Sequence, residues 1–229
     1  MFLRNIKGVF IDLDGTLINS LPVYAETYRI LFEKLNIKTD ENFIKNNGES
    51  PEELAKKIYE KYLKNYGITY ENFFKMRNEI LEKNIDKIKF NLGSKELLFF
   101  LKEKNYKIGI VTSSNRDFTE KVLKNLGLEN FFDIIITSDD VKNTKPDPEP
   151  YILAVKKLNL LAGECLAIED SIYGVISAKS AGLNVIAVLT GVGNKQEFRN
   201  LGIYKIFKNL KEVYKFFEEN LVEKEYNKQ

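Results

Sequence analysis

The sequence predicts an α/β protein built on a parallel sheet with helices on both faces, into which a purely helical segment is inserted. Two observations predict the sheet. Short apolar runs of strand length alternate with helical patterns beyond residue 89, and a similar run stands near the N-terminus. Such alternation is typical of βαβ units, which build parallel sheets. A third observation predicts the insertion, because residues 20–90 carry helical patterns and no β-rich stretch.

The first predicted strand covers residues 6–11. Four further runs have the near-continuous apolar character of strands that are buried on both faces of a parallel sheet. They cover residues 107–111, 134–137, 166–168 and 185–188. The helical patterns between and after them cover residues 94–104, 116–126, 148–159, 171–181 and 210–224.

The inserted segment is predicted to be wholly helical. Pro22 suits the first turn of a helix over residues 23–35. Ser50 followed by Pro51 and two acids is typical of a second helix start, and a third pattern covers residues 70–88. The sequence therefore predicts two domains, which are an α/β core of residues 1–17 and 89–229 and a helical domain of residues 18–88.

The composition excludes several classes of function. Lys+Arg 35 against Asp+Glu 33 gives a net charge of +2, so there is no charge argument for nucleic acid or an acidic membrane as partner. The chain contains no histidine, which excludes His-based triads, His-ligated zinc and histidine general bases. Catalysis must therefore use carboxylates, lysine, hydroxyl groups and metal ions.

The cellular location is also constrained. The single cysteine, Cys165, cannot form an internal disulfide and fits a reducing compartment. No apolar run approaches the length of a membrane span, and the N-terminus lacks a signal-peptide pattern. We expect a soluble cytoplasmic protein, and the sequence leaves monomer and homodimer open.

Two aspartates follow the first predicted strand. Asp12 and Asp14 precede Gly15 and Thr16, and Gly15 indicates a turn that leaves both acids at the carboxyl end of the strand. Two like charges held so close are costly unless a cation or a proton lies between them. Mg²⁺ is the natural hard cation for oxygen ligands. The alternative is an ordinary surface turn, but such a turn does not need an apolar run ahead of it.

Polar side chains also follow three later predicted strands, and ligands of open parallel sheets bind outside the carboxyl ends of the strands. In chain order these residues are Thr112, Ser113, Ser114 and Asn115, then Ser138, Asp139, Asp140 and Lys145, then Glu169, Asp170 and Ser171. Each group has a plainer explanation as a helix cap, and Lys145 as a solvated loop residue. Convergence of four strand ends on one crevice favours a site. Three prolines at 146, 148 and 150 also restrict the backbone around Lys145.

This set of groups permits phosphoryl transfer. Asp12 is the candidate nucleophile, because a carboxylate can form a covalent phosphoaspartate. Asp14 is the candidate acid and base, which protonates the leaving oxygen and then accepts a proton from water. Mg²⁺ and Lys145 offset the repulsion between the phosphate ester and the attacking carboxylate.

The remaining candidate residues bind phosphate or metal. Thr112 and Ser113, with backbone N–H groups at the start of a helix, are expected to hold the phosphate oxygens together with Lys145. The expected metal ligands are the carboxylates of Asp12 and Asp170 and a backbone carbonyl near Asp14, with Glu169 in support behind them.

These residues together resemble the haloacid dehalogenase superfamily of phosphatases. Four motifs carry the resemblance in order along the chain: Asp12-Leu13-Asp14-Gly15-Thr16, Val111-Thr112, Lys145-Pro146 and Glu169-Asp170. The branch resembled is that of phosphoglycolate phosphatase and β-phosphoglucomutase. The resemblance implies a Rossmann-like core, with residues 18–88 as a helical cap inserted between the first and second motifs. We call residues 18–88 the cap segment.

The resemblance implies a Mg²⁺-dependent phosphatase acting on a small phosphorylated metabolite. The dehalogenases of the superfamily lack the second aspartate of the first motif, which is Asp14 here. The mutases carry a cap histidine and a cap arginine, where this chain is expected to hold Tyr24 and the turn around Gly48 and Glu49. These three are the candidate specificity residues, on a cap that opens and closes about joins near residues 15–20 and 88–93.

Two alternatives stay open. One is a sugar-phosphate mutase that returns the phosphoryl group to the product instead of to water. The other is a regulatory module, phosphorylated on aspartate, that turns nothing over. A receiver-like module of that kind would lack the second acid, Asp14, and would not need the long helical insertion.

Overall fold

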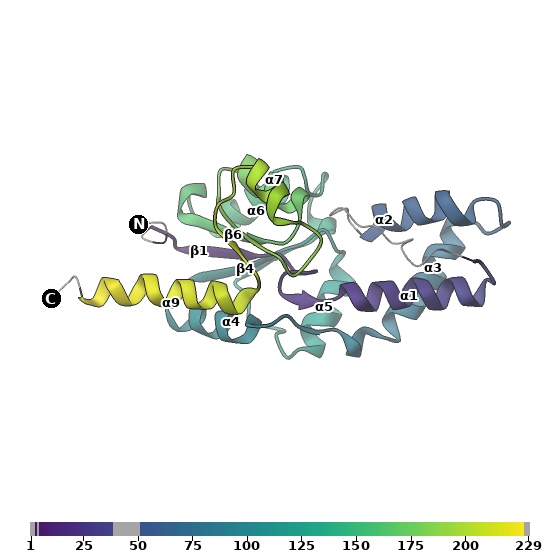
Figure 1. Cartoon of the computed structure of the whole chain (residues 1–229), viewed down its shortest axis with the longest axis horizontal. Coiled ribbons are helices and arrows are strands. Elements are labelled where there is room, and N and C mark those ends of the chain that lie inside the picture. Colours follow the sequence, from purple (N-terminus) through teal and green to yellow (C-terminus); the bar gives the residue numbers. More distant parts are fainter. Residues whose placement is uncertain (1–2, 4, 39–50, 227–229) are drawn as a thin grey trace.

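The computed structural model describes Leu3 and residues 5–38 and 51–226. The turn around Gly48 and Glu49 lies outside these residues, and so does Ser50 with its expected helix cap. The described residues form a six-stranded sheet covered by helices, and the cap helices lie to one side of it (Figure 1).

The six strands of the main sheet are all parallel. Their spatial order is β5 (Ile134–Ile136), β4 (Lys107–Val111), β1 (Gly8–Ile11), β6 (Cys165–Glu169), β7 (Asn184–Val188) and β8 (Ile206–Phe207). The predicted parallel sheet is confirmed. Because β1 lies between β4 and β6, the residues that follow these three strands meet at one edge of the sheet.

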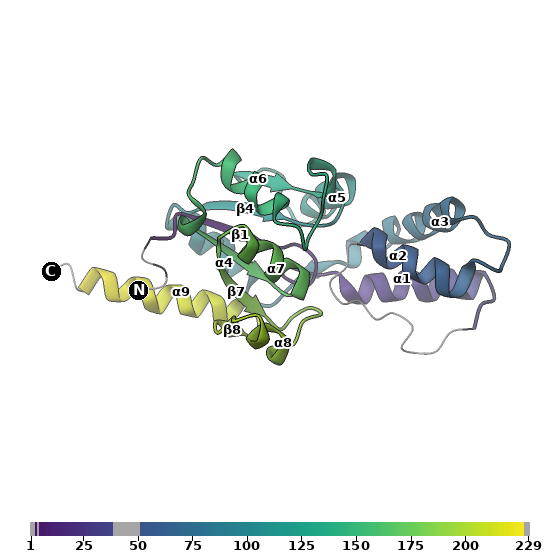
Figure 2. The same cartoon turned by 90° about the horizontal axis from the view of Figure 1, so that it is seen from above.

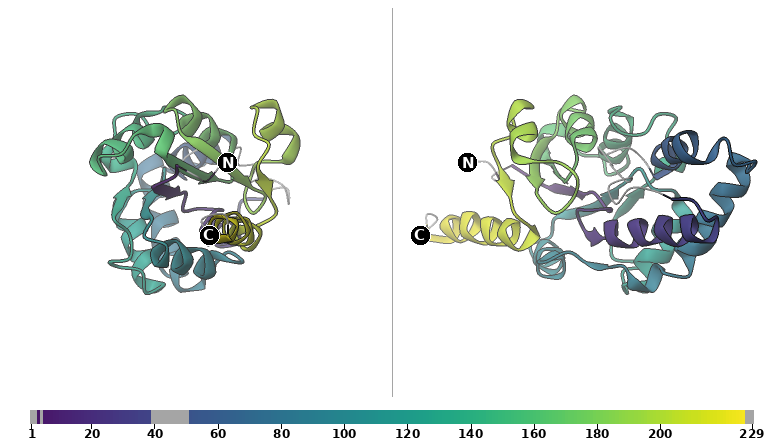
Figure 3. Two further views of the ribbon diagram at one scale, coloured as in Figure 1. Left: turned by 90° about the vertical axis from the view of Figure 1, so that its left-hand side faces the viewer. Right: turned by 45° about the vertical axis from the view of Figure 1, so that its right-hand side comes forward.

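Helices cover both faces of the sheet, as Figure 3 shows. On one face lie α4 (Ser94–Glu103), α5 (Arg116–Asn125) and α9 (Leu210–Tyr226). On the other lie α6 (Glu149–Lys157), α7 (Ile172–Ser180) and α8 (Lys195–Asn200). Strand β1 serves both layers, because Val9 and Ile11 pack with the first group and Phe10 with the second.

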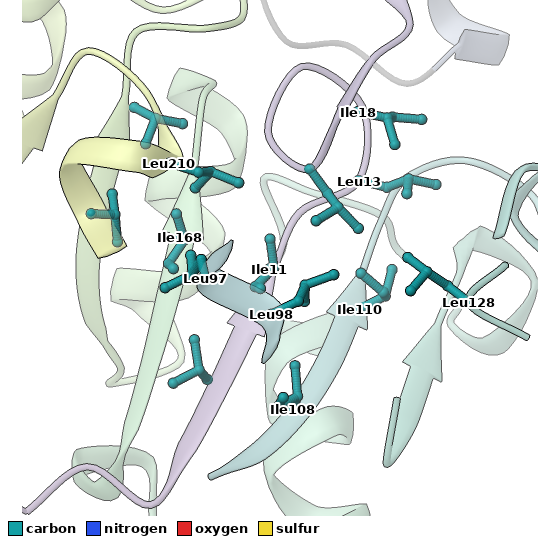
Figure 4. Packing of buried hydrophobic residues seen from close by; sticks show 14 of the residues in the cluster. Ile11, Leu13, Ile18, Leu97, Leu98, Ile108, Ile110, Leu128, Ile168 and Leu210 are labelled. Carbon is teal, nitrogen blue, oxygen red and sulfur yellow. The ribbon is translucent and has the colours of Figure 1, made fainter. Parts of the chain in front are cut away.

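The packing behind the site is dense and apolar. Ile11 and Ile168, from neighbouring strands, pack against Leu97 and Leu98 of α4 and Leu210 of α9 (Figure 4), and none of the five is more than 1% exposed. Truncation of such a side chain to alanine costs about 2–5 kcal/mol. The strand ends that hold the site therefore rest on a close-packed base.

The cap segment contains its own small core. Its helices are α1 (Leu21–Lys34), α2 (Pro51–Ile58) with the π-helical turn η1 (Tyr59–Leu63), and α3 (Tyr70–Glu82). Tyr28, Leu31 and Phe73 are fully buried among them. Figure 2 shows these helices apart from the sheet and its covering helices.

The predicted helix over residues 70–88 is shorter than expected. It ends at Glu82 and is followed by the 3₁₀ turn η2 (Ile85–Lys87). Two further 3₁₀ turns, η3 (Ser138–Asp140) and η4 (Ala162–Glu164), lie in loops of the core.

Two short strands form the joint between cap and core. β2 (Ile18–Asn19) pairs antiparallel with β3 (Lys89–Phe90). The expectation of no strand between residues 20 and 90 is therefore wrong at its last two residues. A two-residue strand has no pattern of its own and exists only through its partner.

Among the described residues, no helix has both the length and the apolar character needed to cross a lipid bilayer.

Candidate active site

Asp12 directly follows β1 at the centre of the sheet edge. Its backbone N–H donates to the carbonyl oxygen of Ile168 (3.0 Å), which continues the pairing of β1 with β6. The chain then turns at Gly15, whose φ is +80°. A Cβ at Gly15 would lie 2.4 Å from Asp170 Oδ2. Glycine is therefore needed here both for the backbone conformation and for the close approach of Asp170.

The turn after Asp12 is held from outside by Asn91, which follows β3. The Asn91 side-chain amide donates to the carbonyl oxygens of Gly15, Thr16 and Ile18, at 2.9, 2.9 and 3.1 Å. Because β3 is where the chain returns from the cap segment, one residue connects the returning chain to the turn that carries Asp14.

Lys145 is a buried lysine at the centre of the site, only 3% exposed. Its ammonium group donates to Asp12 Oδ1 (2.7 Å), Glu169 Oε1 (2.6 Å) and the carbonyl oxygen of Val111 (2.7 Å). Burial alone would lower the pKa of Lys145, but the charges of Asp12 and Glu169 raise it above its usual value. Lys145 therefore stays charged, and these three bonds use all of its donors.

Three carboxylates meet beside Lys145. One oxygen each of Asp12, Glu169 and Asp170 lies within 4.8 Å of the others. Burial raises the pKa of Glu169 to about 7, and burial with the charges of Asp12 and Glu169 raises the pKa of Asp170 well above its usual value. A set of carboxylate oxygens with this excess of negative charge fits a hard divalent cation.

Glu169 and Asp170 have different hydrogen-bond partners, which show where each carboxylate lies in the site. Glu169 Oε1 accepts from both Lys145 and the Tyr151 hydroxyl, the latter at 2.5 Å. Asp170 accepts from Thr16 Oγ1 (3.0 Å) and from the Val192 backbone N–H (3.2 Å), and it lines the pocket. Glu169 thus supports Lys145 from behind, while Asp170 faces the open space.

The loop after β7 encloses Asp170, and the sequence analysis missed it. A Cβ at Gly191 would lie 1.5 Å from Asp170 Oδ2, so only glycine leaves room for the carboxylate. The signal that could have revealed this loop is a Gly-Val-Gly run that begins three residues after the end of a predicted strand.

Asp14 lies in a different environment from Asp12. Its carboxylate is not part of the three-carboxylate cluster, and its Oδ2 accepts from the Ser114 hydroxyl (2.6 Å). Burial raises the pKa of Asp14 to about 6, although the Ser114 hydrogen bond and the positive charge of Arg77 act in the opposite direction. Asp14 can therefore gain and lose a proton close to neutral pH.

Thr112 and Ser113 follow β4 and line the pocket. The backbone N–H of Thr112 donates to the carbonyl oxygen of Ile136 (2.9 Å), and Thr112 Oγ1 accepts from the Ser114 N–H (3.1 Å). At the start of α5, Asn115 Oδ1 accepts the N–H of Phe118 (2.9 Å). The N–H groups of Thr112, Ser114 and Phe118 are thus used within the protein.

The predicted core residues lie around one pocket that is open to solvent. On the core side it is lined by the predicted residues Asp12, Asp14, Thr112, Ser113, Lys145 and Asp170. On the cap side it is lined by Leu21, Tyr24, Pro51, Leu54 and Arg77. Glu169 lies behind Lys145. Gly48 and Glu49 fall outside the described residues.

Tyr24 and Arg77 connect the cap segment to the core. The Tyr24 ring packs on Phe118 of α5 (5.8 Å between centroids), and the Arg77 guanidinium lies over the Tyr24 ring (5.3 Å). Sequence reasoning did not single out Arg77. The signal was present, since residue 77 shares a helix face with Phe73, Ile80 and Leu81 and is the charged residue on that apolar face.

Comparison with known proteins gives the family. The model of the haloacid dehalogenase-like hydrolases matches residues 9–188. A phosphorylated carbohydrates phosphatase of Thermotoga maritima is 34% identical over 182 residues, which cover 79% of this chain and 84% of that protein. The validoxylamine A 7'-phosphate phosphatase of Streptomyces hygroscopicus is 30% identical over 189 residues, which cover 80% of this chain and 86% of that protein.

Solved structures agree in fold. A hydrolase from Pseudomonas syringae, 26% identical, has a TM-score of 0.78 over 93% of this chain and 98% of that one. The predicted family and the predicted class of enzyme are thereby confirmed. This chain belongs to the haloacid dehalogenase-like hydrolase family and is a phosphatase of that family.

Proposed function

We propose that this enzyme hydrolyses a small phosphomonoester in the presence of Mg²⁺, through a covalent phosphoaspartate on Asp12. One observation carries the proposal. Two aspartates two residues apart open into the same pocket, yet Lys145 binds Asp12 and Ser114 binds Asp14. The first is held beside the Lys145 ammonium group, and the second has a pKa of about 6. This division separates a nucleophile from an acid and base.

In the first step a carboxylate oxygen of Asp12 attacks phosphorus, and the bond from phosphorus to the ester oxygen breaks. Asp14 donates its proton to that leaving oxygen, so the product is a neutral alcohol. In the second step water attacks the phosphorus of the phosphoaspartate. Asp14 takes a proton from the water, and the bond to Asp12 breaks to release inorganic phosphate.

The residues around the two aspartates stabilise charge and geometry. Lys145 offsets the repulsion between Asp12 and the phosphate through its charge, because its three N–H bonds are already used. The Thr112 hydroxyl and Ser113 supply the phosphate contacts from the other side of the pocket. Glu169 and the Tyr151 hydroxyl behind it keep Lys145 in place.

Two of the clustered carboxylates, those of Asp12 and Asp170, would hold Mg²⁺. In this proposal the backbone carbonyl of Asp14 would be a further ligand. When bound, the metal ion supplies Lewis-acid polarisation of the phosphate and neutralises charge in the transition state. Thr16 and Val192 hold Asp170 in the orientation for this task.

The substrate class follows from the pocket and from the relatives. The pocket admits a small molecule, and two relatives are named for a phosphorylated carbohydrate and for validoxylamine 7'-phosphate. We propose a phosphorylated small metabolite, covered by the cap segment as a separate domain of residues 18–88, with Tyr24, Gly48 and Glu49 as specificity residues.

The test is a screen of phosphorylated metabolites for phosphate release, with Mg²⁺ and with EDTA, on wild type and Asp12→Asn. Wild type should release phosphate only with Mg²⁺, and acid-quenched protein should carry one phosphoryl group on the peptide that contains Asp12. Asp12→Asn should lose both signals. Retained turnover in this variant would refute the assignment, and conversion of a hexose phosphate to an isomer without phosphate release would indicate a mutase.

A further inference from the structure

Asn91 binds three backbone carbonyl oxygens of the turn that carries Asp14. Its side-chain Nδ2 lies 2.9 Å from the carbonyl oxygen of Gly15, 2.9 Å from that of Thr16 and 3.1 Å from that of Ile18. Two N–H bonds serve three acceptors, so at least one of the N–H bonds is shared. Carbonyl oxygens that converge on one point need a donor there, because each is an obligatory acceptor and their partial charges repel.

The main chain at Asn91 is fixed on both sides. Its N–H donates to the carbonyl oxygen of Leu17 (3.0 Å), and its own carbonyl oxygen accepts the N–H of Ser94 at the start of α4 (3.1 Å). The carbonyl oxygen of the next residue, Leu92, accepts the N–H of Lys211 at the start of α9 (3.1 Å). The side-chain amide therefore projects from a segment that is anchored to the turn and to two helices of the core.

Asp14 depends on this turn for its position. Strand β1 ends at Ile11, three residues earlier, so the pairing of the main sheet does not reach Asp14. The N–H of the following residue, Gly15, donates to the carbonyl oxygen of Ile18 (2.9 Å). That same oxygen is one of the three acceptors of the Asn91 amide. The amide therefore acts one peptide away from Asp14, on the oxygen that closes the turn.

Other side chains also hold the turn, so it should persist without the Asn91 amide. The hydroxyl groups of Thr190 and Ser94 donate to backbone carbonyl oxygens of the turn, at 2.6 and 2.7 Å. Loss of the amide should therefore shift the turn and not unfold it. A shift matters at Asp14, because proton transfer needs the acid within about 2.6–3.2 Å of the oxygen that receives the proton. Displacement of a reacting group by about 1 Å is enough to slow a reaction strongly.

We propose that Asn91 is a positioning residue for the acid step of the reaction, which places the Asp14 carboxyl group within reach of the leaving ester oxygen. Asn91 is not among the described residues that line the pocket, so it acts through the turn and not on the substrate. This inference rests on the proposed function, in which Asp14 donates a proton to the leaving group. It adds a residue that lies outside the four sequence motifs.

The experiment compares two phosphate esters of nearly equal size, para-nitrobenzyl phosphate and para-nitrophenyl phosphate, with Mg²⁺ present. The nitrophenolate is a stable anion that leaves without a proton, whereas the benzyl alkoxide is strongly basic and needs a proton from Asp14. The value of kcat/KM reports the stabilisation of the transition state relative to free enzyme and substrate. The ratio of kcat/KM for the benzyl ester to that for the phenyl ester therefore measures proton donation. A general loss of folded protein or of phosphate binding cancels in this ratio.

Two variants of Asn91 and a matched control are needed. Asn91→Ala removes the amide, and Asn91→Ser leaves a shorter side chain with one donor. The control is Asn184→Ala. Asn184 Nδ2 also donates to two backbone carbonyl oxygens, those of Gly163 (3.0 Å) and Cys165 (3.2 Å), but it lies at the start of β7, at the opposite end of the strand from the site. Asp14→Asn gives the ratio of the enzyme without its acid.

Asn91→Ala should lower kcat/KM for the benzyl ester about 10- to 100-fold more than for the phenyl ester, as part of the roughly 10²- to 10⁴-fold that a general acid supplies. Asn91→Ser should lower the ratio less, and Asn184→Ala should keep the ratio of wild type. Adding Asn91→Ala to Asp14→Asn should not lower the ratio further, because Asn91 acts through that acid.

Equal losses on both esters in Asn91→Ala would overturn the inference, and Asn91→Ser decides in the same way if the alanine variant does not fold. A ratio that fell further in the double variant would also overturn it. Failure of both Asn91 variants to fold would contradict it as well, because the turn is argued to persist without the amide.

Failure of the proposed function would look different. Neither ester would then release phosphate, or Asp14→Asn would have the same ratio as wild type. A ratio that falls in Asp14→Asn but not in Asn91→Ala would overturn only the role of Asn91.

Discussion

Replacing Asp170 by asparagine should make the metal-free protein more stable and the enzyme inactive. Asp170 shares the site with Asp12 and Glu169, whose nearest carboxylate oxygens lie within 4.8 Å. Lys145 binds the other two acids and not Asp170. Without a cation, Asp170 is therefore the acid whose negative charge is least compensated.

The magnitude follows from these distances. Two like charges 4.8 Å apart repel by about 3.5 kcal/mol at an effective dielectric constant of about 20. Asp12 and Glu169 each repel Asp170, and the positive charge of Lys145 cancels about one of these two repulsions. The net effect on Asp170 is therefore roughly one such repulsion. An asparagine has one carbonyl oxygen for Thr16 and Val192, so one hydrogen bond worth about 1 kcal/mol is lost. The expected net gain is about 2.5 kcal/mol in the free energy of unfolding.

The gain should depend on pH with a definite sign. Burial and the neighbouring charges raise the pKa of Asp170 in the folded state. The folded protein therefore holds this proton more tightly than the unfolded chain, and wild type loses stability as the pH rises above the ordinary pKa of an aspartate. Asparagine does not titrate, so the advantage of the variant should grow over the same range.

Urea unfolding followed by circular dichroism, in EDTA and in saturating Mg²⁺, measures both effects. Wild type should gain stability from Mg²⁺, and Asp170→Asn should not, because it lacks one of the ligands. A variant less stable than wild type in EDTA at neutral pH would refute the charge argument. A full Mg²⁺-induced gain in the variant would refute the assignment of Asp170 as a ligand.

Three further predictions address the loop around Asp170, the pKa of Asp14 and the edge of the sheet. Gly191→Ala should weaken Mg²⁺ binding, measured by calorimetry, because the new Cβ would lie 1.5 Å from Asp170 Oδ2. The control is Gly163→Ala, where a Cβ meets no atom within 4 Å, and this variant should bind Mg²⁺ as wild type does. Ser114→Ala removes a hydrogen bond that lowers the pKa of Asp14, so this pKa should rise. The fall of kcat/KM for an alkyl phosphate above pH about 6 should then move to higher pH by up to about one unit. An unmoved profile would argue against Asp14 as the acid. Burial alone would raise the pKa of Asp140, but hydrogen bonds from Thr137 and Arg116 hold it below its usual value; Asp140→Asn should therefore cost about 1–2 kcal/mol at neutral pH. That cost should vanish as the pH falls through the lowered pKa, and a deficit that persisted in acid would contradict this account.

The sheet and the floor of the site were predictable because each rests on a local pattern. Buried parallel strands are short apolar runs, and the polar residue that ends such a run lies at the edge where ligands bind. Asp12 and Thr112 each directly follow an apolar run, and Asp170 follows such a run after one intervening acid, Glu169. Their grouping then follows from the parallel topology, without knowledge of the strand order.

The features that were missed depend on contacts between distant segments. β8 is a two-residue strand that exists because Ile206 pairs with Ala187. The N–H of Thr112 is taken by Ile136 of the neighbouring strand, which cannot be seen before the strand order is known. Helix α8 was different, because Asn194 and Glu197 form a capping box that could have been recognised in the sequence.

The pairing of β2 with β3 has a consequence for how such an enzyme can be built. Asn19 lies opposite Lys89 in an antiparallel register, so the two points where the main chain leaves and re-enters the α/β domain are neighbours. A tight two-residue hairpin turn can span that gap. The residues between are thus a removable module, and a lid of another size or specificity can be exchanged at this ribbon without altering the connectivity of the catalytic sheet. Asn91, which is hydrogen-bonded to the turn beside Asp14, belongs to the α/β domain. It would be retained in any such exchange and would keep Asp14 in position.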